Sequence, residues 1–347
     1  MDPPEKDASV KRIEGPLLAA FAALLFVLAA EALWRMFPAA IPRSVEHLAR
    51  ARVYRYDPGV GVVLRPGVDR ALTIPWLERV VRVRTTGHGR PVGFRDDGFQ
   101  GGPRVAILGD SYTFGYGVDQ GESFPEQLER RLRARGIAID VINGGVPGFG
   151  AREQRRMLEK HVLPLKPALV LVAVYGNDLG DNVRSAHARW LGIREFLGVH
   201  SILYQIASAA RAAHPRIDAR VAGKSPSESR SERPAQRSAE RPSAEGYAIE
   251  RRELARMRNL CAARGVRFGL ILLPDTPPLE EGRLRPEGAA VPILDLEPRF
   301  AGLPRDAWRN PYVGHLTPEA NGWVAEAIAE FMSRNSLIDT GSGPGPA

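Results

Sequence analysis

From Arg104 onward, short apolar runs alternate with segments of helical spacing, and this alternation restricts the fold more than any other feature. We expect strands at 105–108, 139–146, 168–174, 266–273 and 291–296, and helices at 122–135, 152–163, 247–263 and 318–332. The run 168–174 is continuously apolar, as in strands that are buried on both faces of a parallel sheet. Strands that alternate with helices predict an α/β fold with a mostly parallel sheet, whose functional loops follow the carboxyl ends of the strands.

Segments of different composition surround and interrupt this region. Residues 43–102 hold short β-like runs between Pro-rich and Gly-rich turns, which predicts a small, irregular, β-containing lead-in before a main domain at 104–334. Within that domain, residues 213–245 are rich in Ser, Arg, Glu and Pro and have no apolar period, so we expect a disordered polar insertion. Residues 335–347 are expected to form a flexible tail.

The amino-terminal segment predicts where the rest of the chain works. Residues 17–30 are an unbroken apolar run preceded by Lys11 and Arg12. As a helix, residues 15–37 would be long enough to cross a bilayer core of about 30 Å, so we predict a transmembrane signal anchor after a cytoplasmic segment at 1–14. A signal peptide cleaved at Ala30-Glu31-Ala32 and a helix buried in the core are the alternatives. Both the anchor and the cleaved signal predict an exported domain, at the periplasmic or extracellular face.

Composition argues against several classes of protein. The net charge is +8, but no stretch interleaves basic and aromatic residues, so we expect no nucleic-acid partner. The single cysteine, Cys261, excludes an intramolecular disulfide and a Cys-rich metal site, and its helical context favours a buried apolar role. We expect neither a metal nor a cofactor.

Four polar motifs follow expected strands or precede the last helix. The first, GDSYTFG at 109–115, places Ser111 where its hydroxyl can enter a crevice and nearby backbone amides can face an oxyanion. The others are NGGVPGFG at 143–150, YGND at 175–178 and GHLTP at 314–318. Each motif alone is explained by a turn or a helix cap. Their combination of Ser, Gly, Asn and His in that order is far more specific.

This combination resembles the SGNH, or GDSL, hydrolase superfamily over residues 104–334, with the blocks GDSYTFGYGV, NGGVPGFG, GND and VGHLTPEANGWVAEAI. The preceding YDPGVGVVLRPG and PVGFRDD are similar to the lead-in of exported, membrane-anchored bacterial members. The resemblance implies a flavodoxin-like three-layer α/β/α sandwich, preceded in this chain by the amino-terminal transmembrane helix.

The resemblance also implies roles for individual residues. Ser111 would be the nucleophile and His315 the general base. The oxyanion hole would consist of the backbone amides of Ser111 and Gly145 and the side chain of Asn177. Two aspartates of the motifs are expected to hold loop geometry: Asp110 and Asp178.

The chain departs from the family pattern next to the histidine. The family usually has an aspartate three residues before it, where this chain has Tyr312, and some relatives have it two residues before, where this chain has Val313. Three interpretations follow. A backbone carbonyl orients His315 in a Ser–His dyad, or an acid from elsewhere reaches it (Asp306 or Asp295), or the site is impaired and only binds.

The predicted function is that of a serine esterase acting on carboxylic esters. The substrate would be an ester-bearing small molecule or an O-acylated polysaccharide, and de-O-acetylation of a cell-envelope polysaccharide fits the expected location. The same residues would serve an O-acyltransferase, because both reactions form an acyl-enzyme. An impaired carbohydrate-binding or assembly protein is the alternative from another class.

Overall fold

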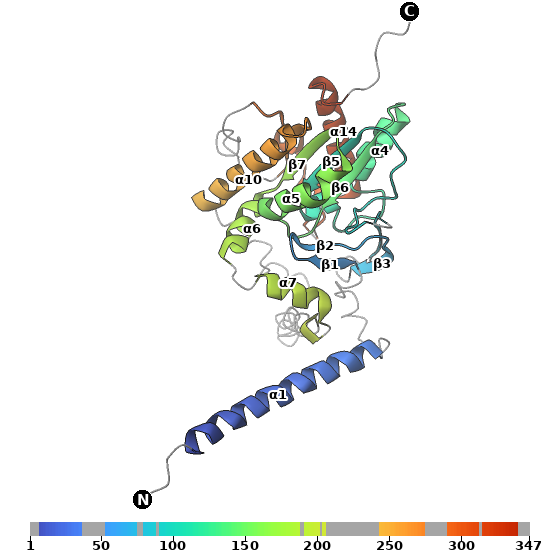
Figure 1. Cartoon of the computed structure of the whole chain (residues 1–347). Helices are drawn as coiled ribbons and strands as arrows, with labels where there is room; N and C mark the ends of the chain where they lie inside the picture. The colour runs from blue at the N-terminus through green and yellow to red at the C-terminus, as the bar shows by residue number, and fades with distance from the viewer. Residues whose placement is uncertain are drawn as a thin grey trace, which may run out of the picture.

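The computed structural model describes residues 7–36, 53–74, 79–87, 90–187, 191–201, 203–205, 243–274, 290–311 and 314–338 (Figure 1). In this part of the chain the main sheet has five parallel strands in the order β6-β5-β7-β8-β9. Their bounds are β5 (Arg104–Gly109), β6 (Asp140–Gly145), β7 (Leu169–Val174), β8 (Arg267–Leu272) and β9 (Ile293–Asp295). The predicted α/β fold with a parallel sheet is confirmed, and the strand order is flavodoxin-like, with its direction reversing at β5.

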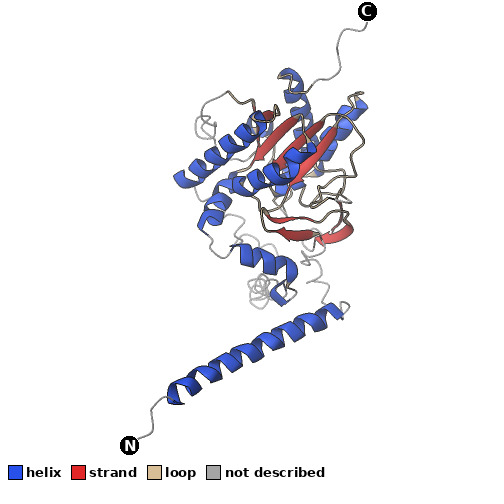
Figure 2. Cartoon of the chain, in the orientation of Figure 1, coloured by secondary structure: helices blue, strands red, loops and turns tan. Residues whose placement is uncertain are grey.

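Helices cover both faces of this sheet (Figure 2). Helices α4 (Phe124–Ala134) and α14 (Pro318–Arg334) pack on one face, and α5 (Ala151–Met157) and α10 (Ala244–Ala262) on the other. Successive side chains of a strand point to opposite faces. Accordingly, Val105 and Ile107 of β5 lie in the core cluster on the side of α4 and α14. Ala106 and Leu108 lie in the cluster on the side of α5 and α10. The sheet is therefore sandwiched between two apolar cores.

Shorter elements connect this framework. The motif that contains Ser111 forms α3 (Ser111–Phe114), and α5 continues into a π-helical turn (Leu158–Val162) and a 3-10 turn (Leu163–Leu165). Helices α6 (Gly176–His187) and α7 (Leu191–His200) occupy a stretch for which the sequence predicted no element. Two short helices precede α14: α12 (Glu297–Phe300) and α13 (Arg305–Trp308).

The lead-in shares a core with the sheet. It contains two antiparallel hairpins, β1 (Tyr54–Asp57) with β2 (Gly61–Leu64) and β3 (Asp69–Ile74) with β4 (Arg79–Arg84). Buried side chains of the hairpins (Val63, Leu64 and Val81) and of the segment after them (Phe94) lie in the same apolar cluster as Leu108 of the sheet. The lead-in is thus packed onto the main domain.

The amino-terminal helix, α1 (Asp7–Met36), includes residues 15–36 of the range 15–37 that was predicted to span a membrane. Leu18, Phe21 and Phe26 are exposed, and the carboxylate of Glu31 accepts hydrogen bonds from the Ser201 hydroxyl and the Leu203 amide. Among the residues that the structure describes, no helix combines the length and the apolar character needed to cross a membrane. The predicted transmembrane helix at 15–37 is therefore not supported.

The remaining segment boundaries can be compared only in part. Of the predicted insertion 213–245, residues 213–242 lie outside the described residues, and Ser243 caps α10 by accepting a hydrogen bond from the Gly246 amide. Leu337 and Ile338 are buried in the core, so the folded domain extends further than the expected boundary at 334, and residues 339–347 lie outside the description. Cys261 is fully buried, and burial raises the pKa of its thiol to about 12, in agreement with an apolar role.

Candidate active site

Ser111 is the first residue of α3, directly after β5 at the carboxyl edge of the sheet. Asp110 caps this helix, and its Oδ1 atom accepts a hydrogen bond of 2.9 Å from the Tyr112 amide. The helix ends at Gly115, whose φ of 80° is left-handed and suits glycine. The amides of Gly115 and Tyr116 both donate to the Ser111 carbonyl. Ser111 therefore sits in a short turn that hydrogen bonds fix at both ends.

His315 lies beside this serine although 204 residues separate them, and its Nε2 atom is 2.7 Å from Ser111 Oγ. The loop that carries the histidine is closed by a β-bridge between Arg309 and Leu316. Inside this bridge the Asn310 amide donates to the His315 carbonyl at 2.7 Å. The structure thus brings together the predicted nucleophile and base at hydrogen-bonding distance.

Two tyrosine rings near Ser111 pack against the imidazole of His315. The ring centroids of Tyr112 and Tyr116 lie 4.6 Å and 5.2 Å from that of His315. The Tyr112 hydroxyl donates a 2.7 Å hydrogen bond to the Gly314 carbonyl, which also accepts from Nε of Arg309. Burial raises the pKa of Tyr112 well above its ordinary value, so the phenol stays protonated and remains a donor.

Asn177 comes from the first turn of α6, after β7, and reaches the residue next to the nucleophile. Its Nδ2 atom donates to Asp110 Oδ2 at 3.1 Å and to Asp181 Oδ2 at 3.2 Å. Since β7 is a neighbour of β5 at the reversal of strand order, the two carboxyl ends meet where ligands of such sheets bind. The third predicted site residue therefore joins the first two.

Asp178 is fully buried behind the site, where its Oδ2 atom accepts a hydrogen bond from the Tyr175 amide. Burial, together with the nearby Asp110, raises the pKa of this carboxyl far above its usual range. The carboxyl of Asp178 thus hydrogen-bonds the backbone just after β7. Among the described residues, no group of three or more His, Cys, Asp or Glu side chains could hold a metal ion.

Gly145 is closely packed, and its amide is already hydrogen-bonded within the protein. It is the last residue of β6, its amide donates to Asn143 Oδ1 at 3.1 Å, and a Cβ atom on it would overlap the Phe114 backbone nitrogen. In the loop that follows, the Val146 amide donates to the Gly109 carbonyl, and the Phe149 amide donates to the Val146 carbonyl. Gly148 is exposed with a φ of 84°, and its amide has no acceptor in the described part of the chain. Among the described residues, the Gly145 amide is thus already hydrogen-bonded and that of Gly148 has no acceptor.

The two aspartates considered as an acid for His315 have other surroundings. Asp295 accepts a hydrogen bond from the Glu297 amide, and Asp306 is an exposed residue of α13. Neither aspartate is hydrogen-bonded to His315 in the described part of the chain, so an acid from these positions gains no support. Tyr312 and Val313 lie outside the described residues.

Comparison with known proteins identifies the family. The model of the GDSL-like lipase/acylhydrolase family matches residues 107–290, which is more than half of the chain. No curated protein matches it. Similar solved structures include TesA, at 18% identity and a TM-score of 0.41 over 68% of this chain and 99% of that one. A lipase/acylhydrolase from Enterococcus faecalis has 17% identity and 0.41 over 67% and 97%, and the psychrotrophic esterase EstA from Pseudoalteromonas sp. 14% and 0.40 over 68% and 100%. On the family match, this chain belongs to the GDSL-like lipase/acylhydrolase family.

Proposed function

We propose that this protein is a serine esterase that hydrolyses carboxylic esters through a Ser111–His315 pair. The observation that carries the proposal is the 2.7 Å distance between Ser111 Oγ and His315 Nε2 at the carboxyl edge of the sheet. A serine hydroxyl is a weak nucleophile until a neighbouring base takes its proton, and this distance allows that transfer. Membership of a lipase and acylhydrolase family supports the same chemistry.

The proposed reaction begins when Ser111 Oγ attacks the ester carbonyl carbon and His315 Nε2 takes the hydroxyl proton. The oxyanion that forms would be stabilised by the backbone amide of Ser111, the side-chain amide of Asn177 and a loop amide after β6. We assign this last donor to Gly148 instead of Gly145, because the Gly145 amide already donates to Asn143. One such donor contributes about 3 kcal/mol to the stability of the transition state.

Collapse of this intermediate expels the alcohol, which takes the proton from His315, and leaves an acyl group on Ser111. Water then attacks the acyl-enzyme, again with His315 as base, and releases the carboxylic acid. Tyr112 and Tyr116 support the proposal because their rings flank the imidazole and limit its rotation. Asn177 would give up one of its two carboxylate acceptors to reach the oxyanion.

Labelling of the full chain with a fluorophosphonate probe tests the proposal. The probe reacts with activated serines, so we expect wild type to be labelled and Ser111→Ala and His315→Gln to lose labelling. Ser333→Ala, which changes an exposed serine of α14, is the control and should be labelled as wild type is. Absence of labelling in folded wild-type protein would contradict the proposal.

We extend the proposal to O-acetyl groups on a cell-envelope polysaccharide. Its support is the acyl chemistry of the site together with the export expected from the sequence. We therefore expect acetate release from acetylated polysaccharides. In a matched series of p-nitrophenyl esters, the acetyl ester should be hydrolysed faster than esters of longer acyl chains. Release that depends on an added sugar acceptor would instead indicate acyl transfer.

We also propose that the hydrolase domain works outside the cytoplasm. The support is sequence alone, namely the apolar run at 17–30 behind Lys11 and Arg12. Fractionation of cells that express the full chain tests this, with expected recovery in the membrane or in the exported fraction. Recovery in the cytosol with an intact amino terminus would contradict it.

A further inference from the structure

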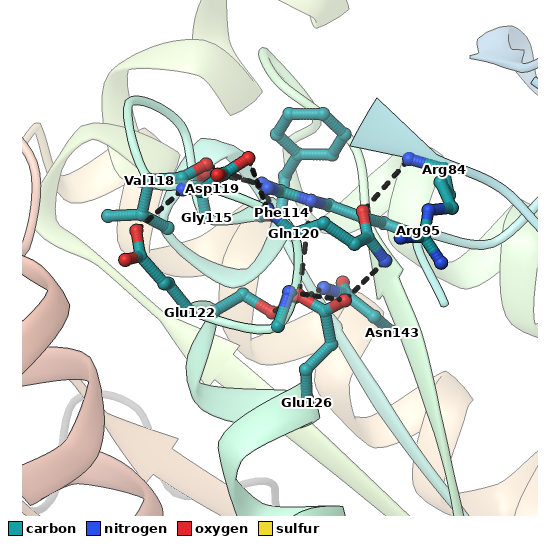
Figure 3. Close-up of polar contacts among 12 residues, drawn as sticks. Arg84, Arg95, Phe114, Gly115, Val118, Asp119, Gln120, Glu122, Glu126 and Asn143 are labelled. Carbon is teal, nitrogen blue, oxygen red and sulfur yellow. Dashed lines mark hydrogen bonds and ion pairs between the residues drawn. The ribbon is translucent and has the colours of Figure 1, made fainter. Parts of the chain in front are cut away.

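A fully buried arginine of the lead-in reaches the carboxyl end of the nucleophile helix (Figure 3). Arg95 follows β4 and pairs with Thr85 in a β-bridge. Its Nη1 atom donates to the carbonyls of Phe114 at 2.8 Å and Gly115 at 2.5 Å, and its Nη2 atom donates to the Val118 carbonyl at 2.7 Å. One guanidinium thus serves three acceptors of a single turn.

That turn is the continuation of α3, whose first residue is Ser111. The amides of Gly115 and Tyr116 donate to the Ser111 carbonyl, and the Tyr116 ring contacts His315. A displacement of the turn would therefore move both the nucleophile and one wall of the imidazole site. The planar fork of arginine suits several fixed acceptors, whereas the ammonium group of lysine is a single point of charge.

A second line of contacts runs from Arg95 to the loop after β6. Its Nε atom lies 4.0 Å from Oε2 of Glu126, a carboxylate that accepts a 2.7 Å hydrogen bond from the Ser123 hydroxyl. The Ser123 hydroxyl in turn accepts a hydrogen bond from Nδ2 of Asn143, whose Oδ1 atom accepts one from the Gly145 amide. The buried Arg95–Glu126 pair is thereby linked to two of the loops that border the site.

This pair is costly to bury. Desolvation lowers the pKa of Arg95 and raises that of Glu126, because both charges have left water. Phe114 also packs its ring against the guanidinium, with Cζ 4.9 Å from the ring centroid. Apolar side chains between lead-in and domain would avoid this desolvation cost. They could not, however, donate the directed hydrogen bonds by which Arg95 holds the three carbonyls.

We propose that Arg95 is a positioning residue of the Ser111–His315 site. It holds the turn after α3 and the loop after β6 in the register that the reaction needs. The lead-in, which precedes the family match at 107–290, is then a functional part of the hydrolase. This inference rests on the proposed esterase function.

The test compares Arg95→Lys with Arg82→Lys in the full chain. Arg82 is the matched control, because it is a lead-in arginine whose ion pair with Asp69 is half exposed, with side-chain exposures of 54% and 50%. Rates of fluorophosphonate labelling and kcat and KM for p-nitrophenyl acetate are measured at a temperature where circular dichroism shows each variant folded. We expect Arg95→Lys to lower the labelling rate and kcat by about tenfold or more with a nearly unchanged KM, since misplaced reacting groups slow chemistry. Arg82→Lys should match wild type.

The outcomes separate this inference from the function on which it rests. If wild type is not labelled, the esterase proposal itself fails. If wild type is labelled and folded Arg95→Lys reacts at the same rate, only the role of Arg95 is overturned. Should Arg95→Lys not fold, Glu126→Gln decides, because it removes the charge beside Nε while one side-chain oxygen remains to accept a hydrogen bond. A slower labelling rate in folded Glu126→Gln supports the inference, and a wild-type rate overturns it.

Discussion

The hydroxyl of Tyr112 donates a 2.7 Å hydrogen bond to the carbonyl of Gly314, a residue 202 positions further along the chain. Tyr112 follows Ser111, and Gly314 precedes His315, whose imidazole faces that serine. The two halves of the site are therefore tied together next to the reacting atoms, by a bond independent of the Ser111–His315 contact. This tie offers a way to change the alignment of the pair without altering either member.

We expect Tyr112→Phe to lower kcat by several-fold while keeping the ring contact with His315. The Gly314 carbonyl would retain the bond from Arg309, so the free energy of unfolding should fall by only about 1 kcal/mol. Steady-state kinetics and urea unfolding measure the two effects. Tyr204→Phe, which changes a half-buried tyrosine outside the site, is the control, and an equal loss of kcat in both variants would argue against the tie.

A substitution at Asp110 separates capping from the placement of Asn177. In Asp110→Asn the side-chain oxygen can still accept from the Tyr112 amide, because asparagine caps helices as well as aspartate does. The new side-chain NH2 group would then face the NH2 group of Asn177, and two donors cannot form a hydrogen bond. We expect kcat to fall about tenfold or more with little loss of stability, since an oxyanion donor is displaced. Asp110→Ala should lose a further 1 kcal/mol or so in urea unfolding. A wild-type kcat in Asp110→Asn would show that Asn177 needs no such partner.

Asp96 predicts a loss of stability as the pH rises. Burial, helped by the nearby Glu129, raises the pKa of Asp96 to about 8 from an ordinary value of 3.8. The folded state therefore binds more protons than the unfolded state between these values, and the free energy of unfolding must decrease across this range. Asp96→Asn is neutral at every pH, so at pH 9 it should be more stable than wild type by at least about 1.4 kcal/mol, the equivalent of one pKa unit.

Urea unfolding of wild type and Asp96→Asn from pH 5 to pH 9 measures this difference. Asp97→Asn is the neighbouring control, because that carboxylate is exposed and paired with Arg84. Burial also raises the pKa of Glu250 to about 7, so a smaller slope of the same sign should remain in Asp96→Asn. Parallel curves for wild type and Asp96→Asn would refute the shift at Asp96.

The two glycines of the loop after β6 should respond differently to alanine. In Gly145→Ala the new Cβ meets the backbone of Thr113 and Phe114, so α3 must move, at a cost of about 1–3 kcal/mol and with loss of labelling at Ser111. In Gly148→Ala nothing lies within 4 Å of the Cβ, and the cost is the left-handed φ alone, about 1–2 kcal/mol. Thermal unfolding and labelling rates distinguish the two, and a labelled, stable Gly145→Ala would contradict the close approach.

The alternation of apolar runs was enough to predict the sheet and most of its helices, because strands buried on both faces leave a continuous pattern. Ser111 and His315 were predicted through the family resemblance that their motifs carry, and the structure places the two side chains 2.7 Å apart. Helix α6 was not predicted, because the glycine and polar residues at 176–178 look like a loop and only the packing of α6 against α10 makes them helical. The open amide of Gly148 was missed because glycines that avoid a clash and glycines that expose an amide look alike in a sequence.

Arg95 left no signal that the residues alone could reveal. Its acceptors are backbone carbonyls of residues 114, 115 and 118, which every amino acid carries. A buried arginine of this kind cannot be distinguished from an exposed one in a turn such as PVGFRDD. Only the folded arrangement shows which turn it serves.

The continuous core of lead-in and sheet sets the limits of the smallest piece of this chain that can fold cooperatively. A truncation to the family match at 107–290 would remove Arg95, the histidine at 315 and helix α14, and would expose the apolar face that Phe94 covers. Such a fragment would retain the nucleophile but neither its base nor its support. The segment that the proposed activity requires is thus longer than the family match at 107–290, at both ends.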